Sequence, residues 1–316
     1  MKTLVDAATE LGITKSTVSR ALSGRGRVSE ETRRKIQEWV QENNYSPNSI
    51  ARSLAEGKTY NIAVVLSGIT DNIFSQRCLV GIAKSIVHDG YDALAVIDYG
   101  DDISSLERVI RNRKVDGVIL TRIVKDDKII KLLKKESIPF VVIGTSTDRK
   151  LYQIDADHRI GSYELARWFL QQGVKRPVLL GGGESYLVNR QRYEGFKEVF
   201  GEDGIVIWNV WTDSDDWVAQ ALAPLIEKNI DGIVCMDDAI CYHVISWLKH
   251  RNYFQLPVIS FYGAPWMEQE ERLRGFLFID SDELGRKAGN AIVSLLQGQK
   301  LQKRMIVPYK LTIKNN

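Results

Sequence analysis

The chain has 316 residues, of which 44% are hydrophobic and 26% charged, as in an ordinary globular protein with room for two or three domains. No apolar run approaches the roughly 20 residues that span a bilayer, and the N-terminus lacks the apolar core of a signal peptide, so we expect a cytoplasmic protein without membrane contact. Cys78, Cys235 and Cys241 are widely spaced and form no metal-binding pattern, which suits a reducing compartment.

The excess of positive charge lies at the N-terminus. Residues 1–58 contain ten Lys and Arg against seven Asp and Glu, whereas the rest of the chain contains 33 of each. Segment 15–35 alone has seven basic residues against two acidic ones. A basic patch on short helices is typical of proteins that bind the phosphate backbone of nucleic acids. Charge alone fits a solvated surface equally well.

Residues 1–46 predict three short helices, because apolar residues recur at the spacing of one helical face. The apolar positions are, helix by helix, Leu4, Ala7, Ala8 and Leu11, then Val18, Ala21 and Leu22, and then Ile36, Trp39 and Val40. Gly12 separates the first two helices, and Ser29 is a suitable N-cap for the third. Two helices joined by a glycine-containing turn are typical of a helix-turn-helix headpiece, although an ordinary three-helix bundle has the same pattern.

Residues 47–58 predict a short hinge helix that Pro47 opens and Gly57 ends. A helix of this length is marginal on its own, since isolated helices under roughly 12–15 residues are rarely stable in water. We therefore expect it to need support from a partner.

Residues 59–316 predict an α/β body, because apolar strands alternate with amphipathic helices. The expected strands form two series, first Ile62–Leu66, Ala93–Ile97, Gly117–Leu120 and Phe140–Ile143, and then Pro177–Leu180, Ile205–Val210, Gly232–Cys235 and Val258–Phe261. Segments 114–120 and 229–235 are similar to one another, which supports two related halves. Each series predicts a doubly wound parallel sheet.

The body is therefore expected to consist of two lobes, lobe 1 at about 59–156 and 283–305 and lobe 2 at about 157–282 and 306–316. The chain would cross between them near Asp157, Asp282 and Val307. Ligand sites form at the carboxyl ends of parallel strands, so a cleft between two such lobes is the expected place for a small molecule.

The N-terminal part resembles the headpiece of the lactose/galactose repressor (LacI/GalR) family. The segments that carry the resemblance are Thr3–Ala8, Thr17–Leu22, Val28–Arg33 and Tyr45–Leu54, and the match runs in register over the first 66 residues. The body is more loosely similar to the periplasmic sugar-binding folds of that family. The resemblance implies a homodimer that binds near-palindromic operator DNA.

The resemblance also implies which headpiece residues contact DNA. Lys15, Ser16 and Arg20 hold base-reading positions, and an Arg side chain can donate two hydrogen bonds to guanine in the major groove. Thr17 and Ser19 hold backbone-contacting positions, with local helix capping as the alternative. In the hinge, Leu54 would wedge into the minor groove with Ala51 beside it. The alternative for Leu54 is packing into a dimer seam or into the body.

In the body, the resemblance implies a set of effector-binding residues. They are Phe74, Arg190, Arg192, Trp217 and Asp238. Arginine and acid side chains suit hydroxyl groups, and an aromatic face suits a sugar ring. The alternatives are a surface ion pair for Arg192, core packing for Trp217 and Phe74, and a helix cap for Asp238. Gly263 stands where members of the family commonly have a sugar-binding aspartate, so the effector or its polar partners are expected to differ.

We therefore expect a transcription regulator, a repressor controlled by a sugar or sugar derivative, with no cofactor and no metal. Whether the ligand releases the protein from DNA or acts as a corepressor stays open, and a non-sugar ligand is the alternative. An enzyme is the rival from another class. Glycines 181–183 lack the spacing of a phosphate loop, and the four histidines (His88, His158, His243 and His250) are scattered along the chain.

Overall fold

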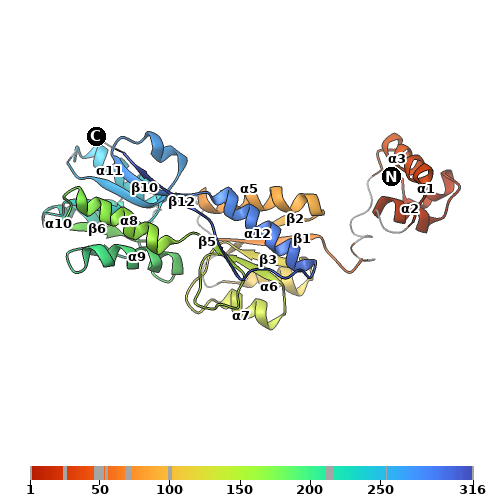
Figure 1. Cartoon of the computed structure of the whole chain (residues 1–316), viewed down its shortest axis with the longest axis horizontal. Coiled ribbons are helices and arrows are strands. Elements are labelled where there is room, and N and C mark those ends of the chain that lie inside the picture. Colours follow the sequence, from red (N-terminus) through yellow and green to blue (C-terminus); the bar gives the residue numbers. More distant parts are fainter. Residues whose placement is uncertain are drawn as a thin grey trace. The chain divides into compact units, whose positions relative to one another are not determined.

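The computed structural model describes residues 2–23, 27–45, 53, 56–67, 73–98, 102–210, 216–253 and 255–314. The chain divides into two compact units, residues 1–59 and residues 60–316 (Figure 1). No helix in the described ranges combines the length and the apolar character that crossing a membrane requires.

The first unit contains the three expected helices. They are α1 (Leu4–Glu10), α2 (Lys15–Ser23) and α3 (Glu30–Glu42). Ala7, Val18 and Ile36 have no exposed surface and form a small core with Trp39. The Ser29 hydroxyl accepts a hydrogen bond from the Thr32 amide, so the expected N-cap of α3 is confirmed. Gly12 has φ +67°, a conformation that glycine adopts without strain between α1 and α2.

Most of the expected hinge helix, including both Ala51 and Leu54, lies outside the described residues. Gly57 is described and has φ +65°, the left-handed conformation that commonly follows the end of a helix.

The second unit contains two six-stranded sheets. The strand order of the first is β11-β5-β4-β3-β1-β2, and that of the second is β12-β10-β9-β8-β6-β7. The first sheet consists of β1 (Asn61–Ser67), β2 (Asp92–Asp98), β3 (Gly117–Leu120), β4 (Phe140–Ile143), β5 (Gln153–Asp155) and β11 (Arg304–Ile306). The second consists of β6 (Pro177–Leu180), β7 (Ile205–Ile207), β8 (Gly232–Cys235), β9 (Val258–Gly263), β10 (Leu273–Ile279) and β12 (Tyr309–Ile313).

Helices cover both faces of each sheet (Figure 1). Around the first sheet lie α5 (Ile73–Ile86), η1 (Val87–Asp89), α6 (Ser104–Arg111), α7 (Lys128–Lys135) and α12 (Ser281–Leu296), and around the second lie α8 (His158–Gln171), α9 (Leu187–Phe200), α10 (Asp216–Ile226), α11 (Asp238–His250) and η2 (Pro265–Gln269). Ile62 and Val64 face the α5–α12 layer, whereas Ala63 and Val65 face the α6–α7 layer. This double burial explains the continuous apolar run of β1, and it confirms a doubly wound architecture in each lobe.

Two features of the sheets differ from the expectation. The sequence pattern missed β5, β10, β11 and β12, and β7 ends at Ile207 rather than Val210. In addition, β12 pairs with β10 in the antiparallel sense, so the second sheet is not wholly parallel. β10 runs toward the junction of the lobes and β12 starts from it, and their directions are therefore opposite.

The chain passes between the sheets at three short segments. They are Ala156–Asp157 between β5 and α8, Asp280 between β10 and α12, and Val307–Pro308 between β11 and β12. After the second passage α12 packs tightly on α5: a Cβ atom on Gly81 would lie 2.1 Å from the Asp282 carbonyl oxygen, and one on Gly285 would lie 2.2 Å from that of Cys78. The close backbone approach joins α12 rigidly to lobe 1.

Candidate functional site

The exposed face of α2 carries the side chains predicted to read DNA. Lys15, Ser16, Ser19 and Arg20 are exposed, and the buried Val18 fixes the opposite side of the helix in the headpiece core. The Arg20 Nε atom donates to the Ser16 carbonyl oxygen at 3.1 Å, which holds the guanidinium along the helix surface. The helix therefore presents one polar, positively charged face.

Thr17 of α2, like Ser16, has its hydroxyl against that of Thr14. Its hydroxyl lies 2.8 Å from that of Thr14, and the Thr14 hydroxyl accepts a hydrogen bond from the Thr17 amide at 3.2 Å. Thr14 is therefore the capping residue, and Thr17 supplies the amide that it caps. Ser19 is exposed and free of such a role among the described residues.

In the body, Arg192 of α9 is buried at the junction of the two lobes, with 6% of its surface exposed. Its Nη1 atom donates to the Met236 carbonyl oxygen at 2.9 Å, and its Nε atom donates to Nδ1 of His158 at 3.3 Å. The guanidinium carbon lies 5.5 Å from the centre of the Tyr262 ring. No described carboxylate forms an ion pair with Arg192, so the surface ion pair considered above is wrong.

His158, the first residue of α8, connects Arg192 to lobe 1. Its Nε2 atom lies 3.0 Å from Oδ1 of Asp155 in β5, and both side chains are almost completely buried. The other carboxylate oxygen of Asp155 accepts a hydrogen bond from the Thr145 hydroxyl, at 3.0 Å. This chain of contacts spans the first passage between the lobes.

Tyr262, at the end of β9, forms a similar connection at the second passage. Its hydroxyl lies 2.5 Å from that of Ser281, the first residue of α12. Its ring meets Phe74 of α5 edge-on, with the ring centres 5.7 Å apart. Burial raises the pKa of the Tyr262 phenol, which keeps the hydroxyl protonated. Phe74 thus lies at the lobe boundary against a lobe-2 side chain.

Two carboxylates lie near Arg192 at the end of β8. Asp237 caps α11 by accepting from the Ile240 amide at 2.9 Å, so the cap that was considered for Asp238 belongs to its neighbour. Burial, together with the charge of Asp237, raises the pKa of Asp238 to about 7. Burial also raises the pKa of Asp237. Asp238 is therefore only partly ionised at neutral pH, and both carboxyl groups can form hydrogen bonds in the site.

Arg190 and Trp217 do not join this cluster. Arg190 pairs with Glu184 at 2.7 Å and lies over the Trp208 ring on the surface of lobe 2. Trp217 of α10 packs partly buried against the lobe-2 core, and its ring lies 6.4 Å from that of His243. Its indole N–H has no partner among the described residues.

A second contact between the lobes lies away from the three passages. Val124 pairs with Tyr186 in a single antiparallel bridge, in which Lys125 N donates to Ser185 O at 3.0 Å and Leu187 N donates to Ile123 O at 3.1 Å. β3 leads into this bridge, and β5 ends at the first passage. Because β4 lies between these two strands, they are roughly 10 Å apart, at about 4.8 Å per strand. The lobes are therefore joined on two sides of the Arg192 cluster (Arg192, His158, Asp155 and Tyr262): at the passages and at this bridge.

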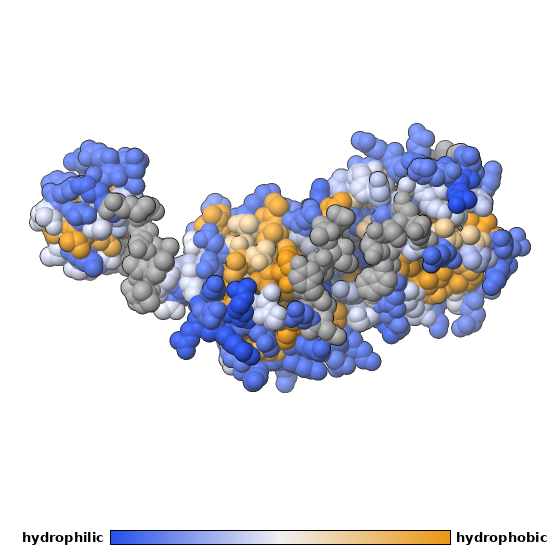
Figure 2. Space-filling view, turned by 180° about the vertical axis from the view of Figure 1, so that it is seen from behind, coloured by the Kyte–Doolittle hydropathy of each residue, from blue (hydrophilic) through white to orange (hydrophobic). Residues whose placement is uncertain are grey.

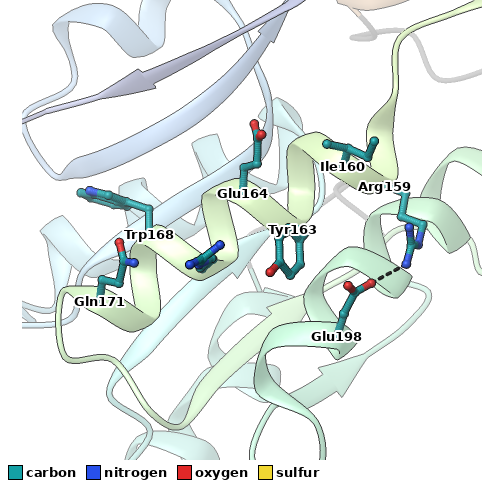
Figure 3. A pocket seen from close by; sticks show the side chains of 8 residues that line it. Arg159, Ile160, Tyr163, Glu164, Trp168, Gln171 and Glu198 are labelled. Carbon is teal, nitrogen blue, oxygen red and sulfur yellow. Dashed lines mark hydrogen bonds and ion pairs between the residues drawn. The ribbon is translucent and has the colours of Figure 1, made fainter.

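A hollow of about 510 Å³ lies elsewhere on lobe 2, along α8 (Figure 3). Arg159 and Glu198 point toward one another at one end of it, and Glu164 and Trp168 lie along its length. None of the predicted effector residues lines this hollow.

Packing leaves no room for a side chain at Gly263. A Cβ atom there would lie 2.1 Å from Cδ2 of Phe276 in β10. An aspartate cannot take this place unless the Phe276 ring moves. The polar side chains near Arg192 include Asp237, Asp238, Tyr262 and His158.

Sequence reasoning missed His158, Asp155 and Tyr262 as members of the cluster. Asp155 and Tyr262 stand at strand ends, and His158 directly follows a passage between the lobes, so the position of each relative to its strand was the available signal. No group of three or more His, Cys, Asp or Glu side chains in the described ranges is arranged to hold a metal ion.

The comparisons with known proteins cover both units. Residues 3–48 match the family model "Bacterial regulatory proteins, lacI family", and residues 59–262 match "Periplasmic binding proteins and sugar binding domain of LacI family". The HTH-type transcriptional regulator MalR of Streptococcus pneumoniae is 25% identical over 333 residues, with 98% of each chain covered.

Two solved structures extend the comparison. A probable maltose operon transcriptional repressor, malR, of Staphylococcus aureus has a TM-score of 0.74 and 26% identity, covering 81% of this chain and 97% of its own. The lac repressor dimer bound to operator and the anti-inducer ONPF has a TM-score of 0.80 at 19% identity, covering 99% and 98%.

Proposed function

We propose that this chain, which belongs to the LacI family of bacterial DNA-binding transcriptional regulators, is a repressor. A carbohydrate bound between the two lobes of its body would control its affinity for the operator. The relatives are transcriptional regulators, and we propose that this chain too has no catalytic activity. Its three cysteines are unpaired and buried, which suits action in the cytoplasm, where its DNA would be.

The DNA-binding part of the proposal rests on α2. Lys15, Ser16, Ser19 and Arg20 share its exposed face, and the net charge of the whole chain comes from its N-terminal part. Lys15, Ser16 and Arg20 would contact bases in the major groove, with Arg20 donating to guanine. The Thr17 and Ser19 hydroxyls would contact phosphates. Ala51 and Leu54 would act in the minor groove from the hinge.

The ligand-site proposal rests on one observation: the buried Arg192 guanidinium at the lobe junction lies over the Tyr262 ring, with Asp237 and Asp238 near enough to act on its charge. Burial lowers the pKa of this guanidinium, and the charges of the two aspartates act in the opposite direction. The group has five N–H donors, and two of them are used within the protein, which leaves three for a ligand. The Asp237 and Asp238 carboxyls can accept from hydroxyls, and the Tyr262 and Phe74 rings offer apolar surface. Two acids beside one arginine favour a neutral polyhydroxyl compound over an anion.

The names of the relatives suggest which carbohydrate to test first. Both MalR of Streptococcus pneumoniae and the staphylococcal maltose operon repressor are similar to this chain over most of its length. We therefore propose maltose, or a related glucoside, as the first candidate effector. Arg190 and Trp217 stay candidates for contacts to a second sugar ring, since both lie on lobe 2.

A homodimer is part of the proposal, because the operator expected for this family is near-palindromic. Hydrophobic residues appear on the surface of both lobes in Figure 2, and Val80 and Val87 of lobe 1 are about half exposed. Exposed apolar patches of this kind are typical of protein interfaces. Sedimentation of the purified chain would report the dimer directly.

The test is isothermal titration of the full chain with maltose, cellobiose, glucose, glucose 6-phosphate and hypoxanthine. The proposal expects a neutral sugar to bind and the phosphate and the nucleobase to fail. Operator affinity measured with and without the bound sugar then separates an inducer, which weakens DNA binding, from a corepressor, which strengthens it. Binding of the phosphate or the nucleobase alone would contradict the carbohydrate assignment.

A further inference from the structure

His158 has two hydrogen-bond partners in different parts of the body, and together they determine its tautomer. An arginine side chain can only donate, so Nδ1 of His158 must accept from Nε of Arg192 through its lone pair. The ring proton is therefore on Nε2, which donates to the Asp155 carboxylate. Asp155 in turn accepts from the Ala156 amide at 2.9 Å and from the Thr145 hydroxyl.

These contacts join three separate elements. Asp155 belongs to β5 of lobe 1, His158 opens α8 of lobe 2, and Arg192 lies in the second turn of α9. All three side chains are at least nine-tenths buried, so water does not compete for their hydrogen bonds. The orientation of the Arg192 guanidinium thus depends on a ring that is itself anchored in the other lobe.

We propose that His158 is a positioning residue: it orients Arg192 for the ligand, and its bond to Asp155 makes that orientation depend on the arrangement of the lobes. The ligand part of this inference rests on the proposed function. The coupling to the lobes does not, because it follows from contacts within the protein. A ligand that binds the oriented guanidinium favours the lobe arrangement in which His158 holds both partners.

Two substitutions separate the functions of the His158 ring. In His158→Asn the amide oxygen takes the place of Nδ1 and can accept from Arg192, but the side chain is too short to reach Asp155. In His158→Gln the amide nitrogen takes the place of Nε2 and can donate to Asp155, but no acceptor faces Arg192. His158→Asn therefore keeps the Arg192 guanidinium oriented and loses the connection to lobe 1. His158→Gln keeps the connection to lobe 1 and loses the orientation of Arg192.

The bridge between the lobes supplies a reporter of their arrangement that needs no ligand. Val124 and Tyr186 form a non-hydrogen-bonded antiparallel pair, for which the Cα atoms are about 4.5 Å apart, within the range of roughly 4.4–6.8 Å that a disulfide tolerates. The double variant Val124→Cys, Tyr186→Cys should form a disulfide only in this lobe arrangement. The native cysteines are buried and do not interfere.

The experiment measures the rate of disulfide formation in this double-cysteine background for three proteins, one that retains His158, one with His158→Asn and one with His158→Gln. We expect His158→Asn to slow the reaction about tenfold, because it loses a hydrogen bond to a carboxylate, and His158→Gln to leave it unchanged. Long-range ¹H–¹⁵N spectra of the unsubstituted chain should show His158 protonated at Nε2 alone. A proton on Nδ1, or equal rates in all three proteins, would overturn the proposal.

Titration with maltose as the probe adds the second half of the test. His158→Gln should raise the maltose Kd by about tenfold or more, whereas His158→Asn should keep it near that of the unsubstituted chain. If His158 only supported the fold, each substitution would change the disulfide rate and the maltose Kd together. Such parallel changes would contradict the proposal. Failure of the unsubstituted chain to bind maltose would count against the proposed effector alone, since the disulfide rates and the spectra still decide the role of His158.

Discussion

Arg192 and Tyr262 lie in cation–π contact, with the guanidinium carbon 5.5 Å from the ring centre, although one side chain comes from α9 and the other from the end of β9. The same ring meets Phe74 from lobe 1 and carries the hydroxyl that pairs with Ser281. Arg192 is therefore attached to lobe 1 through Tyr262 as well as through His158. A ligand held by Arg192 acts directly on both connections.

Arg20 on α2 should discriminate between DNA sequences. Arg20→Ala is expected to cost about 1–3 kcal/mol on the preferred operator, since a bidentate contact to guanine contributes that much discrimination. The loss on random DNA should be smaller. Fluorescence anisotropy with both duplexes at one salt concentration measures the difference. Equal losses on the two duplexes would reassign Arg20 to the phosphate backbone.

Leu54 in the hinge should contribute only to DNA binding. Leu54→Ala is expected to weaken operator binding, because an apolar wedge in the minor groove stabilises the bent duplex. The thermal stability of the body and its affinity for ligand should stay as they are. Differential scanning calorimetry of the same variant provides the control. A lower melting temperature of the body would show that Leu54 is a packing residue.

Asp238 should make the stability of the body depend on pH. Its pKa is raised to about 7, so the native state keeps a proton that the unfolded chain releases at lower pH. This contribution to stability is present at low pH and is lost as the pH rises from about 4 toward about 7, by roughly 4 kcal/mol at about 1.4 kcal/mol per pH unit. Asp238→Asn is neutral throughout, so its melting temperature should exceed that of the unsubstituted chain by more at pH about 7.5 than at pH about 5.

A second carboxyl provides the control for this pH experiment. Hydrogen bonds from Lys134 and Lys150 lower the pKa of Asp148, so its charged form stabilises the native state. Asp148 is ionised in both the folded and the unfolded chain between pH about 5 and pH about 7.5, so Asp148→Asn should lower the melting temperature by the same amount at both pH values. A constant difference between Asp238→Asn and the unsubstituted chain over this range would contradict the buried, protonated Asp238.

Gly263 should not tolerate a side chain. Gly263→Ala places a methyl group against the Phe276 ring and is expected to destabilise the body by about 1–3 kcal/mol, the usual cost of overpacking. Adding Phe276→Leu should recover part of the loss by making room. Urea unfolding of the two variants measures both effects. An unchanged midpoint in Gly263→Ala would show that β10 yields readily at this point.

Much of the fold follows from local pattern. The apolar run Ile62–Leu66 predicts a doubly covered strand because both of its faces are buried, and Ser29 predicts the start of α3 because its hydroxyl can cap the helix. The strands that were missed lack such a signal. β5 and β11 have three residues each and lie toward one edge of their sheet, and Arg274 and Gly275 interrupt the apolar pattern of β10.

The candidate ligand site was only partly predictable for a different reason. Arg192, Asp238 and Phe74 follow from resemblance, and the structure brings them to one region. His158 and Tyr262 join them because the passages at Ala156–Asp157 and Asp280 place the two sheets side by side. That juxtaposition is a property of the folded body, and no spacing along the sequence encodes it.

Control of operator affinity through Arg192 is the central claim, and one measurement tests it most directly. The operator Kd of the full chain and of Arg192→Ala is determined by anisotropy over a series of maltose concentrations, with the sugar identified by titration replacing maltose if another one binds. We predict that the ligand shifts the operator Kd of the unsubstituted chain by about 5–150-fold, the range of typical allosteric couplings, and leaves that of Arg192→Ala unshifted at every concentration. An equal shift in both proteins at the same ligand concentration would contradict the account.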